Sequence, residues 1–403
     1  MIKVPIGVTV GLMALAAAGA FLAGNRYTLD KINSTLGDVN ERQQTYSKLS
    51  EVDTYVRSRY AGAIDEAVLT ESTIEGFVKG LGDEWAEYLT PAEYATRDAA
   101  LEGERTGLGF EYEREPGGYI LITSVDEGGP AEEAGLLAGD VVTAVNNTDV
   151  IAFEGGYEEA VTLFDAAEGT RVKLYIKRTA ADGKTNFIDY SVIAGKSERV
   201  TVSGTSINST AYIRITGFNR CTAKEIREKL EEFSSAKAVI FDVRDTHATD
   251  MDILTDCLEP LLPAGDKVFA AYKDGSTQAV VTLKDEDALS IPVKVLINEN
   301  TDGSGELFAL ALREYASAAL VGMPTRGRGT LQSEYHCSDG SVVLFSAARL
   351  GVGNNTGFED TGVIPDVHCE QDESILPQGM TLSGISDSDR LLYDTQLLRA
   401  LEP

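Results

Sequence analysis

Residues 238–243 read Ala-Val-Ile-Phe-Asp-Val, and this almost unbroken apolar run decides the fold of the second half of the chain. A strand that is apolar on both faces is typical of a parallel sheet covered by helices. Strand and helix patterns alternate around it, at 211–215, 222–233, 251–262, 293–297, 304–315 and 319–321. From about residue 200 the sequence therefore predicts an α/β layer fold with parallel pairing. Asp339-Gly340 predicts a hairpin, and residues 389–401 a final helix.

Before this region lies a module of short strands separated by Gly, Pro and Asn turns. Its strand patterns are GLGFEYE (107–113), GYILITSV (118–125), GDVVTAVNNTDV (139–150) and RVKLYIKR (171–178). Short helical pieces are expected at 130–134 and 156–164. The module has roughly 75–90 residues, a normal size for one domain.

Residues 27–104 are predicted to be helical and polar. Apolar positions recur at helical spacing in residues 49–56, and a second helix is expected to open at Thr70. Thr90 followed by Pro91 predicts a third helix, with Thr90 as its N-cap.

The N-terminal segment from Val4 to Gly24 carries no charged residue. Twenty-one helical residues span about 31 Å, enough to cross a bilayer core. We favour an uncleaved single-pass membrane anchor. A cleaved signal peptide, suggested by the small residues at 16–20, and a buried core helix remain alternatives. The first two interpretations place the bulk of the chain outside the cytoplasm.

Composition excludes several classes of function. The chain has 35 Lys+Arg against 64 Asp+Glu, a net charge of −29, so no nucleic-acid partner is expected. Four cysteines without a Cys/His cluster predict neither a disulfide scaffold nor a metal site, and no cofactor is expected. Cys337 and Cys369 lie in predicted strands, and the sequence allows either a disulfide between them or two free thiols.

Taken in order, several stretches resemble the carboxyl-terminal processing peptidases, also called tail-specific proteases. The resemblance runs from about residue 49 to 401. Its landmarks are GDEWAEYLTP (82–91), GLGF (107–110), PAEEAG (130–135), GDVV (139–142), FDVR (241–244), VG (321–322), RGTLQ (328–332) and GVIPDV (362–367).

The resemblance implies an α+β multidomain protein. Its expected parts are an anchor or signal segment (1–26), a helical N-terminal region (27–104), a PDZ domain (105–197), a layered, crotonase-like α/β protease core (198–375) and a C-terminal helical tail (376–403).

Gly107, Leu108, Gly109 and Phe110 are the expected peptide-binding residues of the PDZ domain. Glycines let consecutive backbone N–H groups turn inward and hold a terminal carboxylate, and the following strand edge accepts an extended peptide. Leu108 and Phe110 are expected to form the apolar pocket for the last side chain. The alternative is a glycine-rich strand start that binds nothing.

The catalytic positions depart from the family pattern. The family's nucleophile is the middle Ser of Ser-Ala-Ser-Ala-Ser-Glu, and its base is the Lys of Gly-Lys-Gly-Ser-Val-Gln, supported by the final Gln. Without a gap, the resemblance places Gly303 at the nucleophile, Arg328 at the base and Gln332 at the supporting Gln. Glycine has no attacking side chain, and arginine stays protonated. The 245–249 turn also lacks the glycines that help to form the family's oxyanion hole.

Ser304, one residue further, is the alternative nucleophile, although we expect Ser304 or Asp302 to cap the following helix instead. His247 is a candidate base for Ser304, against the simpler role of a solvated turn residue. Asp242 and Arg244 are expected to form an internal ion pair.

These observations favour a membrane-anchored, extracytoplasmic pseudoprotease whose PDZ domain binds protein C-terminal tails. The first alternative is an active serine endopeptidase that cleaves C-terminal tails with Ser304. The second is a structural role in which the groove is inactive and the core drives oligomerisation. Besides tail peptides and the membrane, further copies of this chain or an active peptidase relative are the partners left open.

Overall fold

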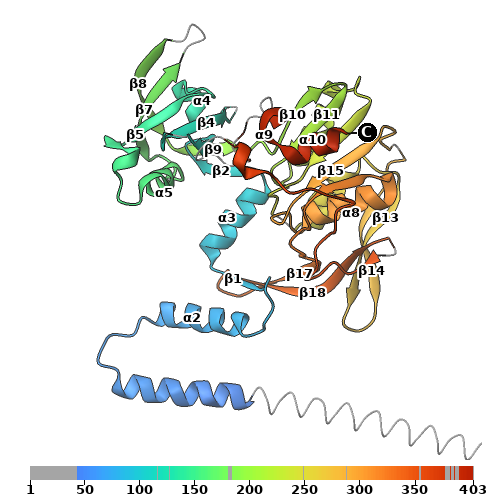
Figure 1. Cartoon of the computed structure of the whole chain (residues 1–403). Coiled ribbons are helices and arrows are strands. Elements are labelled where there is room, and N and C mark those ends of the chain that lie inside the picture. Colours follow the sequence, from blue (N-terminus) through green and yellow to red (C-terminus); the bar gives the residue numbers. More distant parts are fainter. Residues whose placement is uncertain are drawn as a thin grey trace, which may run out of the picture. The chain divides into compact units, whose positions relative to one another are not determined.

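The computed structural model describes residues 43–402 except for 116, 127, 180–183, 248, 287, 354, 377–381, 383–384 and 386–389 (Figure 1). The apolar segment predicted to enter a membrane lies outside these residues. Among the helices that are described, none combines the length and hydropathy needed to cross a bilayer. The chain divides into two units, Met1–Ser72 and Thr73–Pro403.

The described residues before 80 are mostly helical. Residues 43–59 form one helix, which contains the predicted amphipathic stretch, and α2 (Glu66–Lys79) forms the next. The expected start at Thr70 is wrong by four residues. The helix begins earlier because the Asp65 side chain accepts hydrogen bonds from backbone N–H groups in the first turn.

The third predicted helix, α3 (Pro91–Leu101), begins as its sequence indicates. The Thr90 hydroxyl accepts a hydrogen bond from the Glu93 N–H (3.3 Å), and the Glu93 carboxylate accepts one from the Thr90 N–H (2.9 Å). This reciprocal capping box satisfies two backbone donors at the helix start.

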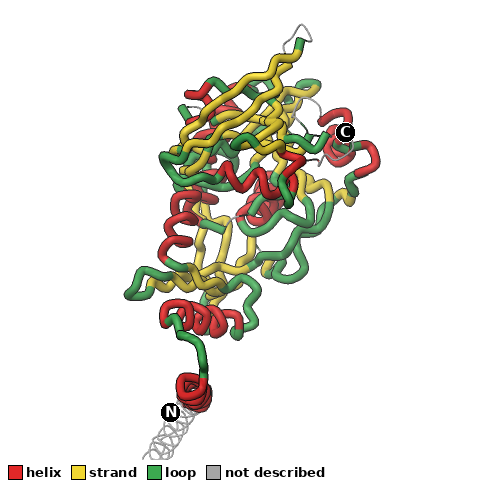
Figure 2. Tube along the Cα trace, turned by 90° about the vertical axis from the view of Figure 1, so that its left-hand side faces the viewer, coloured by secondary structure: helices red, strands yellow, loops and turns green. Residues whose placement is uncertain are grey.

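The β-rich domain contains one antiparallel sheet, drawn as adjacent yellow tubes in Figure 2. Its strands are β3 (Phe110–Arg114), β4 (Ile120–Val125), β5 (Val141–Val145), β6 (Thr148–Asp149), β7 (Arg171–Thr179) and β8 (Thr185–Ile193). The order is β3-β4-β5-β7-β8, with β6 paired to β5. Strand β3 therefore ends the sheet and pairs, among the described residues, with β4 alone.

The predicted strand GLGFEYE is divided in two by its glycines. β2 (Glu104–Gly107) pairs with β9 (Gly195–Glu198) in a separate ladder, and β3 starts at Phe110. Gly109 has a φ of 78°, a left-handed conformation that glycine adopts without strain. The helical pieces of this domain are α4 (Pro130–Ala134), η1 (Val150–Ala152), α5 (Gly156–Val161) and η2 (Thr162–Phe164).

The first sheet of the core confirms the α/β prediction. Its strands, in spatial order, are β10 (Val202–Ile207), β11 (Thr210–Ile215), β12 (Ala238–Asp242), β15 (Val293–Ile297), β16 (Ala319–Gly322) and β20 (Val367–His368). From β11 onward every neighbouring pair is parallel. The apolar run that begins at residue 238 forms β12, which has a neighbour on each side and helices over both faces, and this explains why Ala238–Phe241 are all apolar.

Helices cover both faces of this sheet. On one face, Phe241 of β12 packs edge to face with Phe308 of α8 (Ser304–Ala316), at 5.5 Å between ring centroids. On the other, Ile240 shares a core with Leu397 of α10 (Thr395–Leu401). Alternate residues of β12 thus serve opposite layers.

A second core sheet was only partly predicted. Its strands are β1 (Glu87–Leu89), β13 (Gly265–Tyr272), β14 (Thr277–Leu283), β17 (Thr330–His336), β18 (Val342–Val352) and β19 (Asn355–Thr356). The Asp339-Gly340 hairpin joins β17 to β18 as predicted, whereas β13 and β14 were missed. Helix α8 packs against both sheets and so lies between them. The remaining core helices are α6 (Thr222–Glu232) and α7 (Met251–Leu258).

The final helix is broken in two, contrary to the sequence prediction. Arg390–Tyr393 forms α9, and α10 starts after Asp394. Asp394 leaves the helical conformation because its carboxylate caps α10, accepting a hydrogen bond from the Leu397 N–H at 2.8 Å.

Candidate functional site

A fully buried carboxylate, Glu306, connects the segments that carry the predicted catalytic positions. Its Oε2 accepts hydrogen bonds from the backbone N–H groups of Gly303 (3.0 Å) and Arg328 (2.8 Å). Its Oε1 accepts from the Gly327 N–H (2.7 Å) and from the Thr325 hydroxyl. The first turn of α8 is thereby held against the 325–328 loop. Burial raises the pKa of Glu306 to about 6, although these donors oppose the shift.

Gly303 occupies the turn between β15 and α8. It is the N-cap residue of the helix, with φ 55° and ψ −113°. This left-handed conformation is costly for a residue that carries a Cβ. The turn therefore brings the backbone sharply from strand to helix, with no side chain at its apex.

Ser304 is the first residue of α8 and is fully buried. Its hydroxyl accepts a hydrogen bond from the Asp250 backbone N–H at 3.3 Å. The prediction that Ser304 or Asp302 caps the helix is wrong: the side chain that reaches back to the N-cap N–H is that of Glu306.

His247 pairs with Asp302, the residue before the turn. Its Nδ1 lies 3.2 Å from Asp302 Oδ2, and its side chain is 58% exposed. Among the described residues, no hydrogen bond joins His247 to Ser304. Ala248, within the predicted oxyanion turn, lies outside them.

Arg328 and Gln332 lie together, as their motif predicts. Arg328 Nη2 donates to Gln332 Oε1 at 2.8 Å, and Gln332 Nε2 donates to the Trp85 carbonyl at 2.5 Å. The Arg328 guanidinium stacks over the Trp85 ring at 4.7 Å and lies 4.0 Å from Asp302. Burial lowers the pKa of Arg328 and Asp302 opposes this, but an arginine stays protonated at physiological pH.

Residues 82–89, which served only as a landmark in the sequence, contact this site in the structure. The Trp85 ring contacts two cations, because the Arg326 guanidinium also lies over it, at 4.9 Å from the centroid. The Asp83 carboxylate accepts hydrogen bonds from both the N–H and the hydroxyl of Ser346. Beyond Trp85, β1 pairs with β18. The available signal in the sequence was Trp85, the single tryptophan of the chain, inside the landmark GDEWAEYLTP (82–91).

In the β-rich domain, Leu108 and Phe110 are buried, with 2% and 3% of their surface exposed. The Leu108 N–H donates to the Phe164 carbonyl at 3.0 Å, and the Gly109 carbonyl accepts from the Asp126 N–H at 3.0 Å. Gly107 ends β2, so the four predicted binding residues link the two ladders.

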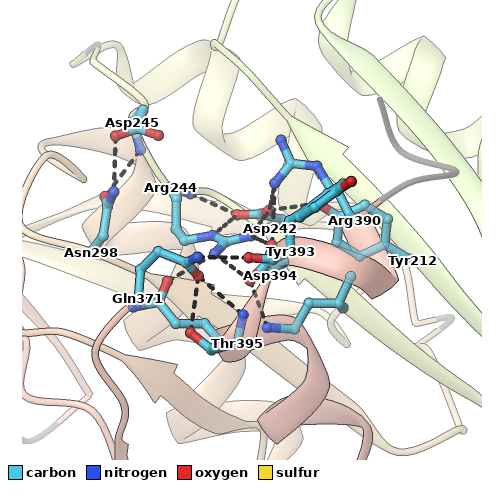
Figure 3. Close-up of polar contacts among 12 residues, drawn as sticks. Tyr212, Asp242, Arg244, Asp245, Asn298, Gln371, Arg390, Tyr393, Asp394 and Thr395 are labelled. Atoms are coloured by element: carbon cyan, nitrogen blue, oxygen red, sulfur yellow. Dashed lines mark hydrogen bonds and ion pairs between the residues drawn. The ribbon is translucent and has the colours of Figure 1, made fainter. Parts of the chain in front are cut away.

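The predicted ion pair of Asp242 and Arg244 is confirmed and belongs to a larger buried cluster (Figure 3). Two guanidinium nitrogens of Arg244 donate to Asp242, at 2.8 and 2.6 Å, and Arg244 also donates to Asp394 at 2.6 Å. Arg390 reaches the same Asp394 at 3.2 Å. Burial alone would raise the pKa of Asp242, but Arg244 outweighs it and holds that pKa below its usual range. The cluster ties the C-terminal helices to β12 and structures the core.

Neither a disulfide nor a metal centre is found in the described part. Cys221, Cys257, Cys337 and Cys369 are all free thiols, so Cys337 and Cys369 do not form the bridge that the sequence left open. No group of three or more His, Cys, Asp or Glu residues there is arranged to hold a metal ion.

Comparisons with known proteins assign both modules. Residues 209–369 match the model of peptidase family S41, and residues 121–178 match the model of the PDZ domain. The carboxy-terminal processing protease CtpA of Bacillus subtilis (strain 168) is 28% identical over 367 residues, covering 90% of this chain and 76% of that protein. A "Probable CtpA-like serine protease" of Staphylococcus aureus (strain COL) is 26% identical over 368 residues, covering 89% and 72%.

The solved structure of an S41-protease-type chain from Bacteroides fragilis NCTC 9343 has the same fold. Its TM-score is 0.54 at 16% identity, and the match covers 86% of this chain and 94% of that one.

Proposed function

We propose that this chain, whose core matches peptidase family S41 and whose β-rich domain matches the PDZ domain, is a CtpA-like protein that binds protein C-terminal tails without cleaving them. The single observation that carries the proposal is Gly303 at the apex of the turn between β15 and α8. Serine hydrolases present a nucleophilic side chain from such a sharp strand-to-helix turn. A glycine there has nothing with which to attack a carbonyl.

The surroundings of Gly303 support the same conclusion. Arg328 aligns with the family's lysine. Its guanidinium stays protonated, donates to Gln332 and stacks over Trp85, so it does not accept a proton from a nucleophile. The hydroxyl of Ser304 is fully buried and accepts a backbone hydrogen bond, and His247 pairs with Asp302 instead. Nucleophile and general base are therefore both missing from the position where the family places them.

Tail binding rests on the PDZ domain. Strand β3 ends the sheet directly after Gly107, Leu108 and Gly109, and among the described residues its outer edge pairs with no other strand. Backbone pairing at such an edge supplies affinity, and a backbone nest captures the terminal carboxylate. We propose peptides with free, apolar C-termini as ligands.

The test is a combined cleavage and binding assay on the full-length chain. Unstructured proteins and apolar-tailed peptides are incubated with it and with Ser304→Ala, and products are read by mass spectrometry. We expect no cleavage by either protein, and binding that is lost when the peptide is amidated. Cleavage by the wild-type chain that disappears in Ser304→Ala would overturn the proposal and identify Ser304 as a nucleophile.

We further propose that residues 4–24 anchor the protein as a single membrane span, with the rest of the chain extracytoplasmic. The charge-free length of this segment supports it. Protease added to intact cells should digest the chain, and removal of residues 1–26 should release it from the membrane fraction. Membrane retention of the truncated chain would contradict the anchor. Copies of this chain, or an active peptidase relative, are the expected scaffold partners.

A further inference from the structure

We infer that the tail-binding groove is closed by the chain's own residues 162–165, which a bound tail must displace. The inference rests on the proposed function of the PDZ domain and concerns how that site is regulated. Three features of this short segment, which comprises η2 and Asp165, point to it.

The first feature is a hydrogen bond to the carboxylate-binding loop. The Leu108 N–H, one of the donors expected to hold a tail's carboxylate, donates instead to the Phe164 carbonyl at 3.0 Å. The two backbones are in close contact, because a Cβ built on Gly107 would lie 2.6 Å from that same carbonyl oxygen. An incoming carboxylate therefore competes with an oxygen that is already in place.

The second feature is the Phe164 side chain. Its ring packs edge to face against Phe110 (5.0 Å) and against Tyr112 of β3 (5.1 Å). Phe164 and Phe110 are each 3% exposed. The apolar space beside β3, predicted to receive the last side chain of a tail, is therefore occupied by Phe164.

The third feature is the charge that follows. Asp165 is exposed, and its negative charge adds to burial in raising the pKa of the Tyr112 hydroxyl. The segment thus places the Phe164 carbonyl at the loop and the Phe164 ring beside β3, and Asp165 adds a negative charge at its end. The segment occupies the site as a surrogate ligand.

This arrangement makes tail affinity depend on the fraction of molecules in which the segment has moved away. An apparent dissociation constant equals the intrinsic constant divided by that open fraction. Phe164→Leu keeps an apolar side chain but removes both aromatic contacts, so it weakens the closed state. We expect this variant to bind a tail about tenfold more tightly. Phe187→Leu, at a phenylalanine of β8 that is 76% exposed, is the matched control and should bind like the wild type.

The experiment uses the full-length chain and a fluorescein-labelled decapeptide ending in Leu-Ala-Ala, with its amidated form as the control. Fluorescence polarisation gives the affinity of each protein. Hydrogen–deuterium exchange by mass spectrometry then follows the wild-type chain with and without saturating peptide. We expect exchange to rise in residues 160–168 and to fall in residues 107–112. This readout is independent of whether the Phe164 variant folds well.

The outcomes separate the two proposals. Tail binding by Phe164→Leu that exceeds wild-type binding, or that appears only in the variant, supports the closed groove. Wild-type binding with unchanged exchange at 160–168 would overturn the closed groove and leave tail binding intact. If neither protein binds a free-carboxylate peptide, the tail-binding function fails and the inference fails with it.

Discussion

Replacing the buried carboxylate at Glu306 should change how stability responds to pH. Burial holds the pKa of Glu306 at about 6, above the ordinary value of 4.5. This difference corresponds to about 2 kcal/mol, at ~1.4 kcal/mol per pH unit. Because the folded chain binds this proton more tightly than the unfolded chain, the contribution is present in full below pH 4.5 and is lost as pH rises through 6. Glu306→Gln has no such proton and removes the dependence.

The assay is urea unfolding of the wild type and of Glu306→Gln between pH 4.5 and 7.5. Fluorescence of Trp85, the single tryptophan of the chain, reports on the site itself. The other acidic groups cancel when the free energy of unfolding of the variant is subtracted from that of the wild type. That difference should be about 2 kcal/mol more favourable to the wild type at pH 4.5 than at 7.5. Glu314→Gln, at an exposed position of the same helix, is the matched control variant.

A difference for Glu306→Gln that stays constant within ~0.5 kcal/mol would refute the reasoning. It would mean that the four donors around the carboxylate offset the whole cost of burial and keep Glu306 ionised.

Four further predictions follow from the site and the core. Gly303→Ala should lower the free energy of unfolding by about 1–2 kcal/mol, because its φ of 55° is strained for alanine; an unchanged urea midpoint would contradict this. Asp394→Ala should cost about 3–5 kcal/mol in the same assay, since it leaves two buried arginines short of a counter-charge. Arg328→Ala should shift Trp85 emission to the red more than Arg326→Ala does, because Arg328 is the more buried of the two; equal shifts would count against the stacking. Gly303→Ser combined with Arg328→Lys should cleave an unstructured protein where neither single variant does, and a double variant without activity would show that the oxyanion turn is also lost.

Much of the fold was predictable because the relevant interactions are local. The capping box at Thr90 and Glu93 lies within one helical turn. The apolar residues from 238 onward are enough to predict that β12 is covered on both faces. The Asp339-Gly340 turn defines its own hairpin. In each case the residues that decide the structure are neighbours in the chain.

Some errors occur where contacts made by the folded chain override a local signal. The last helix breaks at Asp394, whose carboxylate caps α10 and is also held by Arg244, 150 residues away in the chain. Ser304 is a residue type that often caps helices, but here Gly303 is the N-cap residue and the Glu306 carboxylate accepts the hydrogen bond from its N–H. Strands β13 and β14, in contrast, form a local hairpin around Asp274-Gly275, so a turn signal of the same kind as Asp339-Gly340 was overlooked there.

From motif order and spacing alone, the sequence predicts the order of the modules and aligns Gly303, Arg328 and Gln332 with the family's catalytic positions. What surrounds those residues became known from the packing of the folded chain. The hydrogen bond from Gln332 to the Trp85 carbonyl spans 247 positions, and the Leu108 N–H, which the motif predicted as a donor to a bound tail, donates to the Phe164 carbonyl instead. Such contacts depend on how separate elements pack, so residue type and spacing do not specify them.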